Sequence, residues 1–500
     1  MTNAINTLSV SAQRVSEILA GIPTQLLIDG GLQDASDGAT FEVLNPATGE
    51  KLCDVASASG LDAIQAMVAA HNAQKEWAHT PARTRASLLH KLFDLIQENA
   101  EELAVIMTLE MGKPLEQSYG EVTYGGEFFR WFAEQAAHLD GHYSDTPESN
   151  LRMIVSHQPI GPTYAVTPWN FPLAMATRKL APALAAGCTT IVKPSELTPL
   201  TTLKLGQLIQ EAGFPAGVVN ILPTVDAPAV SDAIMSDRRL RKISFTGSTE
   251  VGRHLLRSAA DNILRTSMEL GGNAPFIVLE DADLELAVEG AVAAKMRNMG
   301  EACTAANRFI VHASLADEFA SRLATKFRDM KVGNGLDPET YCGPLISEKA
   351  LERVAGLVED AAQRGAQILC GGHKIEGAGN FYPPTVLHNV PAGSRVLTEE
   401  IFGPVAPIIT FQTLEEAIEL ANDTEYGLAS YLYTRDVQLG LEINEHLEAG
   451  LMGLNVGVIS NAAAPFGGLK QSGMGREGGQ EGIHDYMDTR YVGLPRSNRL

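Results

Sequence analysis

Between residues 160 and 280, short apolar and β-branched runs alternate with helical patterns, and this alternation constrains the fold most strongly. The runs that predict strands are 164–167, 189–192, 218–222, 242–246 and 276–279. The helical patterns between them are 178–187, 200–213 and 250–260. Such alternation predicts an α/β fold with a doubly wound parallel sheet. Ligands of these sheets bind beyond the carboxyl ends of the strands.

The segments on either side of this region have different textures. The first 140 residues read mainly as helix, with apolar residues at helical spacing over 61–78 and 84–111. A second α/β pattern occupies 284–465, with helices expected at 284–299, 315–330 and 351–365. The last stretch, 483–500, is strand-like and too short to form a core, so we expect it to pair with another segment or another subunit.

Length and composition place the chain among globular proteins. At roughly 150 residues per domain, 500 residues suggest about three domains. The net charge of −22 disfavours nucleic acid and anionic membranes as principal partners. Five scattered cysteines without a C-x-x-C pair predict neither a disulfide framework nor a zinc site. With no basic segment at the N-terminus and with proline or glycine interrupting the uncharged stretches, we expect a cytoplasmic protein.

One glycine motif is misleading. Residues 473–478 (GMGREG) satisfy G-x-G-x-x-G, but no strand–helix–strand unit can follow in the twenty-two residues that remain. We therefore predict a tight glycine-rich turn there. Residues 247–252 (GSTEVG) are better placed, because they follow a predicted strand and open a helix whose N–H groups suit a pyrophosphate. Taken alone, this segment is equally consistent with an ordinary strand–helix turn.

Other polar groups at predicted strand ends are individually ambiguous. Lys193 and Glu196 could contact phosphate or ribose, yet a polar strand end is more often a solvated turn. Cys303 could be a nucleophile, although most lone cysteines are inert. Glu269 precedes a double glycine and lies 34 residues before Cys303, so spacing alone does not bring the two together. No metal-binding motif is present, and no metal site is predicted.

Taken together, these motifs resemble the aldehyde dehydrogenase superfamily over nearly the whole chain. The matching segments are 167–172 (TPWNFP), 193–196 (KPSE), 245–249 (FTGST), 269–273 (ELGGN), 300–303 (GEAC), 400–404 (EIFGP) and 465–468 (PFGG). Seven motifs in one order form a specific signal. The resemblance implies an aldehyde dehydrogenase-like fold: a doubly wound parallel-sheet cofactor domain, a second α/β catalytic domain and a small β oligomerisation element.

The resemblance also assigns roles. Cys303 would attack the aldehyde, Asn170 and the Cys303 amide would bind the oxyanion, and Glu269 would activate the hydrolytic water. NAD or NADP would be the cofactor, and Glu196 favours NAD because a carboxylate repels a 2′-phosphate. The residues implied in cofactor binding are Trp169, Lys193, Ser195, Glu196, Gly247, Ser248, Leu270, Glu400 and Phe402.

Within the superfamily, the run 453–460 (GLNVGVIS) resembles succinate-semialdehyde dehydrogenases. This branch binds the far carboxylate of its substrate through positions that match Arg178, Arg297 and Ser460. Glutarate semialdehyde stays an alternative substrate, because one methylene discriminates by only ~1–3 kcal/mol. A broader aldehyde dehydrogenase, a CoA-acylating dehydrogenase and a non-catalytic binding protein are further alternatives, and intact Cys303, Asn170 and Glu269 argue against the last.

The resemblance also implies domain boundaries, and the sequence differs from the family pattern at a few positions. The cofactor domain would comprise 24–142 and 161–270, the catalytic domain 271–470, and the oligomerisation element 143–160 and 484–500 of a homodimer or homotetramer. The branch often carries Cys-x-Cys at the nucleophile, but Ala305 stands here, so we expect no disulfide switch. Met296 and Pro223-Thr224 also depart from the usual pattern.

Overall fold

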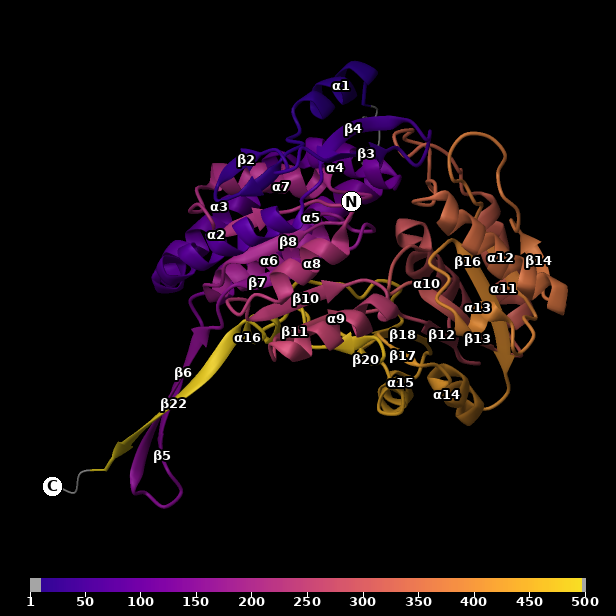
Figure 1. Cartoon of the computed structure of the whole chain (residues 1–500). Coiled ribbons are helices and arrows are strands. Elements are labelled where there is room, and N and C mark those ends of the chain that lie inside the picture. Colours follow the sequence, from indigo (N-terminus) through magenta and orange to yellow (C-terminus); the bar gives the residue numbers. More distant parts are fainter. Residues whose placement is uncertain (1–9, 497–500) are drawn as a thin grey trace.

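The computed structural model describes residues 10–496. Within this range the chain forms two large sheets, each covered by helices, and a three-stranded sheet that projects from the body (Figure 1). Two further two-stranded pairs lie outside these sheets, β3 (Thr40–Leu44) with β4 (Lys51–Ala56) and β17 (Tyr426–Gly427) with β20 (Leu469–Lys470). The two large sheets determine where a site can form.

The first sheet has the strand order β2-β1-β9-β8-β7-β10-β11-β21. Its strands are β1 (Leu26–Ile28), β2 (Gly31–Gln33), β7 (Thr163–Val166), β8 (Thr190–Lys193), β9 (Val219–Ile221), β10 (Lys242–Thr246), β11 (Arg265–Glu269) and β21 (Gly473–Met474). The five strands from β9 to β11 are parallel. Residues of β8, β9 and β10 are buried throughout, as expected for parallel strands that are covered on both faces.

Helices cover both faces of this sheet. Alternate residues of one strand divide between two cores: Ala165 packs with α3 to α7, whereas Tyr164 packs with α2, α8 and α9. These helices are α2 (Gly60–His79), α3 (Ala82–Glu98), α4 (Ala100–Met111), α5 (Leu115–Gln135), α6 (Ala174–Ala186), α7 (Leu200–Ala212), α8 (Ala227–Met235) and α9 (Thr249–Asp261); α1 (Ala12–Ala20) packs on α4. The predicted doubly wound sheet is therefore confirmed.

The second sheet has the order β14-β15-β16-β13-β12-β18-β19. Its strands are β12 (Ala274–Val278), β13 (Ala306–His312), β14 (Gln367–Cys370), β15 (Thr385–His388), β16 (Val405–Phe411), β18 (Ala429–Tyr433) and β19 (Leu451–Leu454). The helices around it are α10 (Leu284–Met296), α11 (Ala316–Arg328), α12 (Glu348–Arg364), α13 (Arg395–Thr398), α14 (Leu414–Asn422) and α15 (Val437–Asn444). Only the four residues 270–273 connect this sheet to β11 of the first.

The projecting sheet joins the middle of the chain to its C-terminal part. It contains β5 (His142–Asp145), β6 (Leu151–Pro159) and β22 (Met487–Pro495), with β22 antiparallel to β6 along nine residue pairs. It extends away from both large sheets (Figure 1). The expected strand near the C-terminus is therefore present, after a short helix α16 (Glu481–His484), although 497–500 lie outside the described residues.

The sequence-based element assignments differ from the structure in three informative places. The helical pattern over 84–111 is interrupted at Asn99, which separates α3 from α4. Strand β11 was not predicted, because its residues 265–269 (RTSME) include a single strongly apolar side chain. The misleading motif at 473–478 contains the edge strand β21, which pairs antiparallel with β11, and no helix of more than four residues follows it in the described chain.

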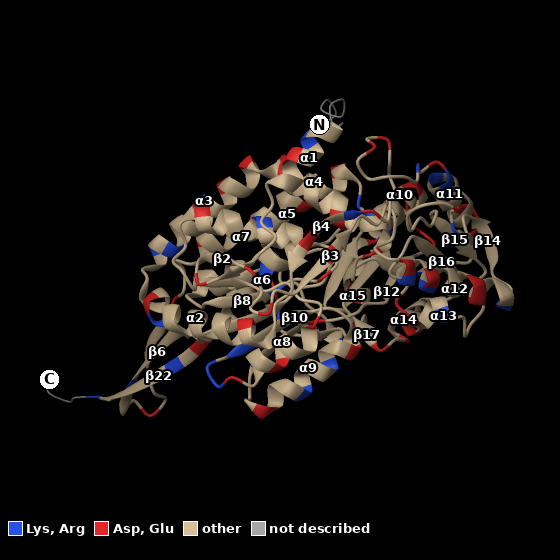
Figure 2. Cartoon of the chain, turned by 45° about the horizontal axis from the view of Figure 1, so that its top comes forward, with Lys and Arg blue, Asp and Glu red and all other residues tan. Residues whose placement is uncertain are grey.

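Electrostatic features of the surface agree with the composition. In the view of Figure 2, basic residues are dispersed among acidic ones over both halves of the molecule. Among residues 10–496, no helix combines the length and apolar character that a bilayer crossing requires. The same part of the chain holds no group of three or more His, Cys, Asp or Glu side chains placed to bind a metal ion.

Candidate active site

The carboxyl ends of four parallel strands bring the predicted motifs to one edge of the first sheet. Thr167 follows β7, Lys193 ends β8, Gly247 follows β10 and Glu269 ends β11. Chain order reverses between β7 and β10, since β7 continues to β8 on one side and β10 to β11 on the other. A crevice forms beyond such a reversal point, and it is the usual ligand site of an open α/β sheet.

Two predicted cofactor groups lie at the end of β8. Lys193 is buried, and its Nζ lies 3.7 Å from the carboxylate of Glu196, whose side chain is 44% exposed. Burial lowers the pKa of Lys193, and the neighbouring Glu196 opposes this change. The Ser195 hydroxyl accepts from the Leu197 N–H at 3.2 Å, so it shapes the turn.

The start of α9 provides the second part of a cofactor site. Ser248 caps this helix, its hydroxyl accepting from the Val251 N–H at 3.4 Å, and Gly247 precedes the cap. A Cβ at Gly247 would lie 2.5 Å from the Phe245 ring, so the turn requires glycine. The positive end of α9 thus faces the crevice with little side chain in front of it. Buried Leu270 donates its N–H to the Ser472 carbonyl at 2.9 Å and packs in the core under α9.

The segment after α13 contributes Glu400 and Phe402 from the second sheet's side. The Glu400 carboxylate accepts from the Gly272 N–H at 3.0 Å, and burial raises its pKa to about 7. The ring of Phe402 stands edge-on to Trp169, with centroids 5.4 Å apart. Residues 193 and 247 thus lie at the carboxyl ends of β8 and β10, the strands on either side of β7 in the first sheet. The segment 400–402 is joined to the chain near that edge by the Glu400–Gly272 hydrogen bond and the Trp169–Phe402 ring contact.

The chain makes a sharp turn just before Cys303. Helix α10 ends at Met296, and Asn298, Met299 and Gly300 follow with φ of 54°, 54° and 78°. A Cβ at Gly300 would collide with the Gly403 carbonyl, so glycine is required there. This turn leaves Cys303 partly exposed as a free thiol. Burial of the site raises the pKa of Cys303 to about 12, and Arg178 opposes that shift.

Asn170 lies beside the nucleophile segment. Its Nδ2 donates to the Glu301 carbonyl at 2.9 Å, which fixes the orientation of the amide and leaves its second N–H for another acceptor. Asn298 donates from its own amide to the Asn170 carbonyl and to the Glu301 carbonyl, both at 2.9 Å. The side chain of Asn170, the predicted oxyanion donor, is thus fixed to the backbone of Glu301, which precedes Cys303 by two positions.

Glu269 is buried, and neither carboxylate oxygen has a hydrogen-bond partner within residues 10–496. Burial raises its pKa well above the usual range, and repulsion from Glu477 raises it further. Gly272, three residues after Glu269, lies against the Cys303 backbone, because a Cβ at Gly272 would collide with the Cys303 carbonyl. The charge of Glu269 contributes to the raised pKa of Cys303. A desolvated carboxyl with a raised pKa suits a general base for water.

We expect Glu269→Gln to slow steady-state turnover by about 10²–10⁴-fold, the usual contribution of general acid–base catalysis. Acylation does not need this base, so one equivalent of reduced cofactor should still form in a rapid burst. Stopped-flow absorbance of the reduced nicotinamide measures both phases. Simultaneous loss of burst and steady state would assign Glu269 to a step before hydride transfer.

A cavity of about 330 Å³ adjoins this constellation. Arg297 and Ser460 line it, and the Arg297 guanidinium donates to the Ser460 hydroxyl at 3.0 Å. Tyr124 and Phe171 line it too and flank the guanidinium, with their ring centroids 5.4 Å and 4.9 Å from it. In the described part of the chain Arg297 pairs with no carboxylate, so its charge is available to an anion.

Arg178 is not among the residues that line this cavity, and its role beside Arg297 and Ser460 stays a prediction. It is 2% exposed, pairs with the Glu477 carboxylate and lies 4.0 Å from the centre of the Phe466 ring. Glu477 also pairs with Lys179 at 2.5 Å. Arg178 therefore shares one carboxylate with Lys179, and this arrangement explains why a glutamate belongs in the misleading glycine motif.

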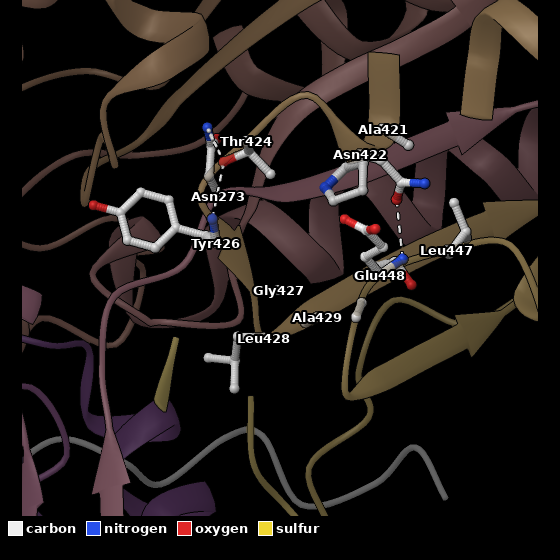
Figure 3. Close-up of a pocket in the computed structure, with 13 residues that line it drawn as sticks. Asn273, Ala421, Asn422, Thr424, Tyr426, Gly427, Leu428, Ala429, Leu447 and Glu448 are labelled. Carbon is white, nitrogen blue, oxygen red and sulfur yellow. Dashed lines mark hydrogen bonds between the residues drawn. The ribbon is translucent and has the colours of Figure 1, made fainter. Parts of the chain in front are cut away.

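A second, much smaller pocket lies beside β18 (Figure 3). Its volume of about 10 Å³ holds at most one water, so it cannot accept an aldehyde. Asn273, the last residue of the 269–273 motif, reaches this pocket, where its Nδ2 lies 3.5 Å from the Thr424 hydroxyl and 3.0 Å from the Leu397 carbonyl. The end of that motif thus connects the start of β12 to α13 and to the loop after α14.

Comparison with known proteins decides what this arrangement represents. Residues 33–492 match the aldehyde dehydrogenase family. The chain belongs to that family. As a family member it is an NAD(P)-dependent aldehyde dehydrogenase whose catalysis depends on a cysteine, and the resemblance inferred from the seven motifs is confirmed.

Several aldehyde dehydrogenases are similar over almost their full length. The succinate-semialdehyde dehydrogenase of Paenarthrobacter nicotinovorans is 54% identical over 89% of this chain and 98% of its own. The succinate-semialdehyde dehydrogenase [NADP(+)] of Escherichia coli and the glutarate-semialdehyde dehydrogenase of Pseudomonas putida are each 47% identical over 94% of this chain and 97% of theirs. A crystal structure of succinate-semialdehyde dehydrogenase from Burkholderia pseudomallei superimposes with a TM-score of 0.94 at 45% identity, covering 95% and 98% of the two chains.

Proposed function

We propose that this aldehyde dehydrogenase oxidises succinate semialdehyde to succinate. The observation that carries the proposal is Arg297, a cavity-lining guanidinium with no carboxylate partner in the described chain, hydrogen-bonded to Ser460. An aldehyde with a carboxylate at its far end would supply the missing partner. Charge-assisted, bidentate contacts make such a pairing strong. Lys113 lines the same cavity and is already paired with Glu121.

The proposed reaction starts at Cys303. Its thiolate attacks the aldehyde carbon and forms a thiohemiacetal, whose oxyanion accepts hydrogen bonds from the free N–H of Asn170 and the Cys303 amide. Loss of hydride from this intermediate leaves a thioester. Glu269 then takes a proton from water, the resulting hydroxide attacks the thioester, and Cys303 leaves with the release of succinate.

NAD or NADP, the cofactor of this family, accepts the hydride when bound. The crevice fits a dinucleotide: Lys193 and the N-terminus of α9 offer positive charge for its phosphates, and the carboxylates of Glu196 and Glu400 offer acceptors for ribose hydroxyls. The absence of a side chain at Gly271 leaves room, because a Cβ there would lie 2.9 Å from the Glu400 carboxylate. Trp169 and Phe402, in edge-on contact with each other, add aromatic surface for the dinucleotide.

The choice between the two nucleotides rests on Glu196. Its carboxylate would accept from a free 2′-hydroxyl and repel a 2′-phosphate, which favours NAD. Lys193, 3.7 Å away, reduces that repulsion, and the exposed Glu196 side chain can turn toward solvent. The E. coli relative carries NADP in its name, so the similarity does not choose for this chain. We propose that NAD is used at least as well as NADP.

We expect Glu196→Ser to raise kcat/KM with NADP relative to NAD, because the substitution removes the charge that opposes the 2′-phosphate. Initial rates with each cofactor at saturating aldehyde measure the ratio. Glu415→Ser on α14 removes an exposed carboxylate of equal charge outside the proposed cofactor site and controls for a general change in surface potential. A wild-type enzyme that strongly favours NADP would contradict the role given to Glu196.

We further propose a cytoplasmic homodimer or homotetramer. The projecting sheet supports oligomer formation, because the side chains of Tyr143, Tyr491 and Val492 on it are 62%, 56% and 51% exposed. The division into cofactor, catalytic and oligomerisation segments at the predicted boundaries also stays a proposal.

One assay tests the main proposal. Rates of nicotinamide reduction are compared for succinate semialdehyde, glutarate semialdehyde and butanal, with and without coenzyme A. We expect kcat/KM to be highest for succinate semialdehyde and to be unaffected by coenzyme A, since water is the acyl acceptor. A higher kcat/KM for glutarate semialdehyde would make that aldehyde, one methylene longer, the assigned substrate. Equal kcat/KM values for all three aldehydes would indicate a general aldehyde dehydrogenase.

A further inference from the structure

A buried ion pair is hydrogen-bonded to the backbone of the proposed oxyanion donor, and both of its members line the same cavity as Arg297 and Ser460. Lys113 is 1% exposed, and its Nζ lies 2.5 Å from the Glu121 carboxylate. The same Nζ donates to the backbone carbonyl of Asn170 at 2.8 Å. Lys113 comes from the loop between α4 and α5 and Glu121 from α5, so the pair connects the helical layer to the segment that follows β7.

Glu121 holds the other end of that segment. Its second carboxylate oxygen accepts from the N–H groups of Leu173 and Ala174 at 2.9 Å and 3.0 Å. These are among the first N–H groups of α6, which has no side-chain cap of its own. One ion pair therefore fixes both the Asn170 carbonyl and the start of the helix that begins four residues later.

The Asn170 carbonyl has a second donor, the Asn298 amide, at 2.9 Å. Lys113 and Asn298 approach the same oxygen from different parts of the fold, and neither contacts Cys303 by a hydrogen bond. Nothing in this arrangement adds a donor to the oxyanion itself. The two donors instead fix the position of Asn170, and the side chain of Asn170 supplies a donor to the oxyanion.

We infer that Lys113, with Glu121, is a positioning residue for oxyanion stabilisation by Asn170. The inference rests on the proposed function of Asn170. An oxyanion donor is effective only when it is aimed at the place where charge develops, and a displacement of about 1 Å can cost ~10²-fold in rate. Two buried charges are an expensive way to stabilise a fold, so their attachment to this carbonyl gives them a specific use.

The test removes both charges together. Lys113→Met/Glu121→Gln keeps the volume of the pair and leaves no uncompensated buried charge, and the glutamine oxygen can still accept from the start of α6. We expect kcat for succinate semialdehyde to fall at least tenfold, and for butanal by the same factor, because positioning does not depend on the substrate's carboxylate. A loss confined to succinate semialdehyde would instead mean that Lys113 binds that carboxylate.

A double-mutant cycle separates positioning from general structural support. In an Asn170→Ala background the donor is already absent, so Lys113→Met/Glu121→Gln should have little further effect on kcat. If kcat of the triple variant falls by the product of the two separate reductions, Lys113 and Glu121 act independently of Asn170, and the inference is overturned. If Asn170→Ala alone leaves kcat unchanged, the proposed function of Asn170 fails, which is a different outcome.

Two further variants keep the test decisive. Asn298→Gly removes the other donor to the same carbonyl, and glycine accepts the positive φ of that position, so it should also lower kcat for both aldehydes and lose its effect when Asn170 is alanine. Lys204→Met removes another buried lysine, which connects α7 to α4 through an ion pair with Glu102 at 2.7 Å. This variant should lower thermal stability without changing kcat. A kcat loss in Lys204→Met equal to that of the double variant would contradict a specific role for Lys113.

Discussion

Cys303→Ala is expected to abolish dehydrogenase turnover while cofactor binding persists. Cys303 is the partly exposed end of a turn built by three consecutive residues with positive φ, and no other cysteine lies within thirty residues of it in sequence. The groups at the ends of β8 and β10 that would hold the dinucleotide do not depend on the thiol. Steady-state absorbance measures turnover, and quenching of tryptophan fluorescence by added NAD or NADP measures binding.

The raised pKa of Cys303 adds a second expectation. Burial favours the neutral thiol, so in the absence of cofactor only a small fraction is thiolate at pH 7. The rate of alkylation by iodoacetamide should then rise about tenfold per pH unit between pH 7 and 9, followed by mass spectrometry of residue 303. More than a trace of activity in Cys303→Ala would remove it from the proposed mechanism, and Cys188→Ala, at a buried thiol away from the site, is the matched control.

Much of the site could be predicted because it occupies the ends of strongly patterned strands. The apolar run 242–246 coincides with β10, and the polar residues that follow such runs must gather at one sheet edge when the strands are parallel. Family resemblance then assigned roles to Cys303, Asn170 and Glu269. The fold class, the family and the enzyme class predicted in this way are confirmed.

What the sequence did not reveal depends on contacts between distant segments. Lys113 follows the glycine that ends α4 and resembles an ordinary residue at the end of a helix. Only the folded structure shows that its side chain reaches the backbone carbonyl of Asn170. Strand β11 lacks an apolar pattern, since its buried Ser267 is hydrogen-bonded to the side chains of Lys242 and Asp485, which are distant in sequence. The prediction for Arg178 considered its charge but not Glu477, which lies 299 residues later and pairs with both Arg178 and Lys179.

This last difference leads to the second large prediction, that Arg297→Met discriminates between aldehydes. Methionine can pack between Tyr124 and Phe171, so the cavity keeps its apolar walls while it loses the charge. The loss of a charge-assisted contact to a buried carboxylate costs about 2–5 kcal/mol, or roughly 30-fold and more in kcat/KM. We therefore expect kcat/KM to fall by about this factor for succinate semialdehyde and by far less for butanal.

Arg178→Met is the matched control, because it removes the same charge from an arginine that is paired with a carboxylate, Glu477. Removal of Arg178 leaves Glu477 with Lys179 as its remaining close cation and withdraws a positive charge that lowers the pKa of Cys303. Both effects act on the nucleophile and its surroundings, so both aldehydes should lose activity to a similar extent. If Arg297→Met reduces kcat/KM equally for succinate semialdehyde and butanal, the cavity does not recognise a carboxylate. If Arg178→Met is the variant that discriminates, its guanidinium must exchange Glu477 for the substrate during catalysis.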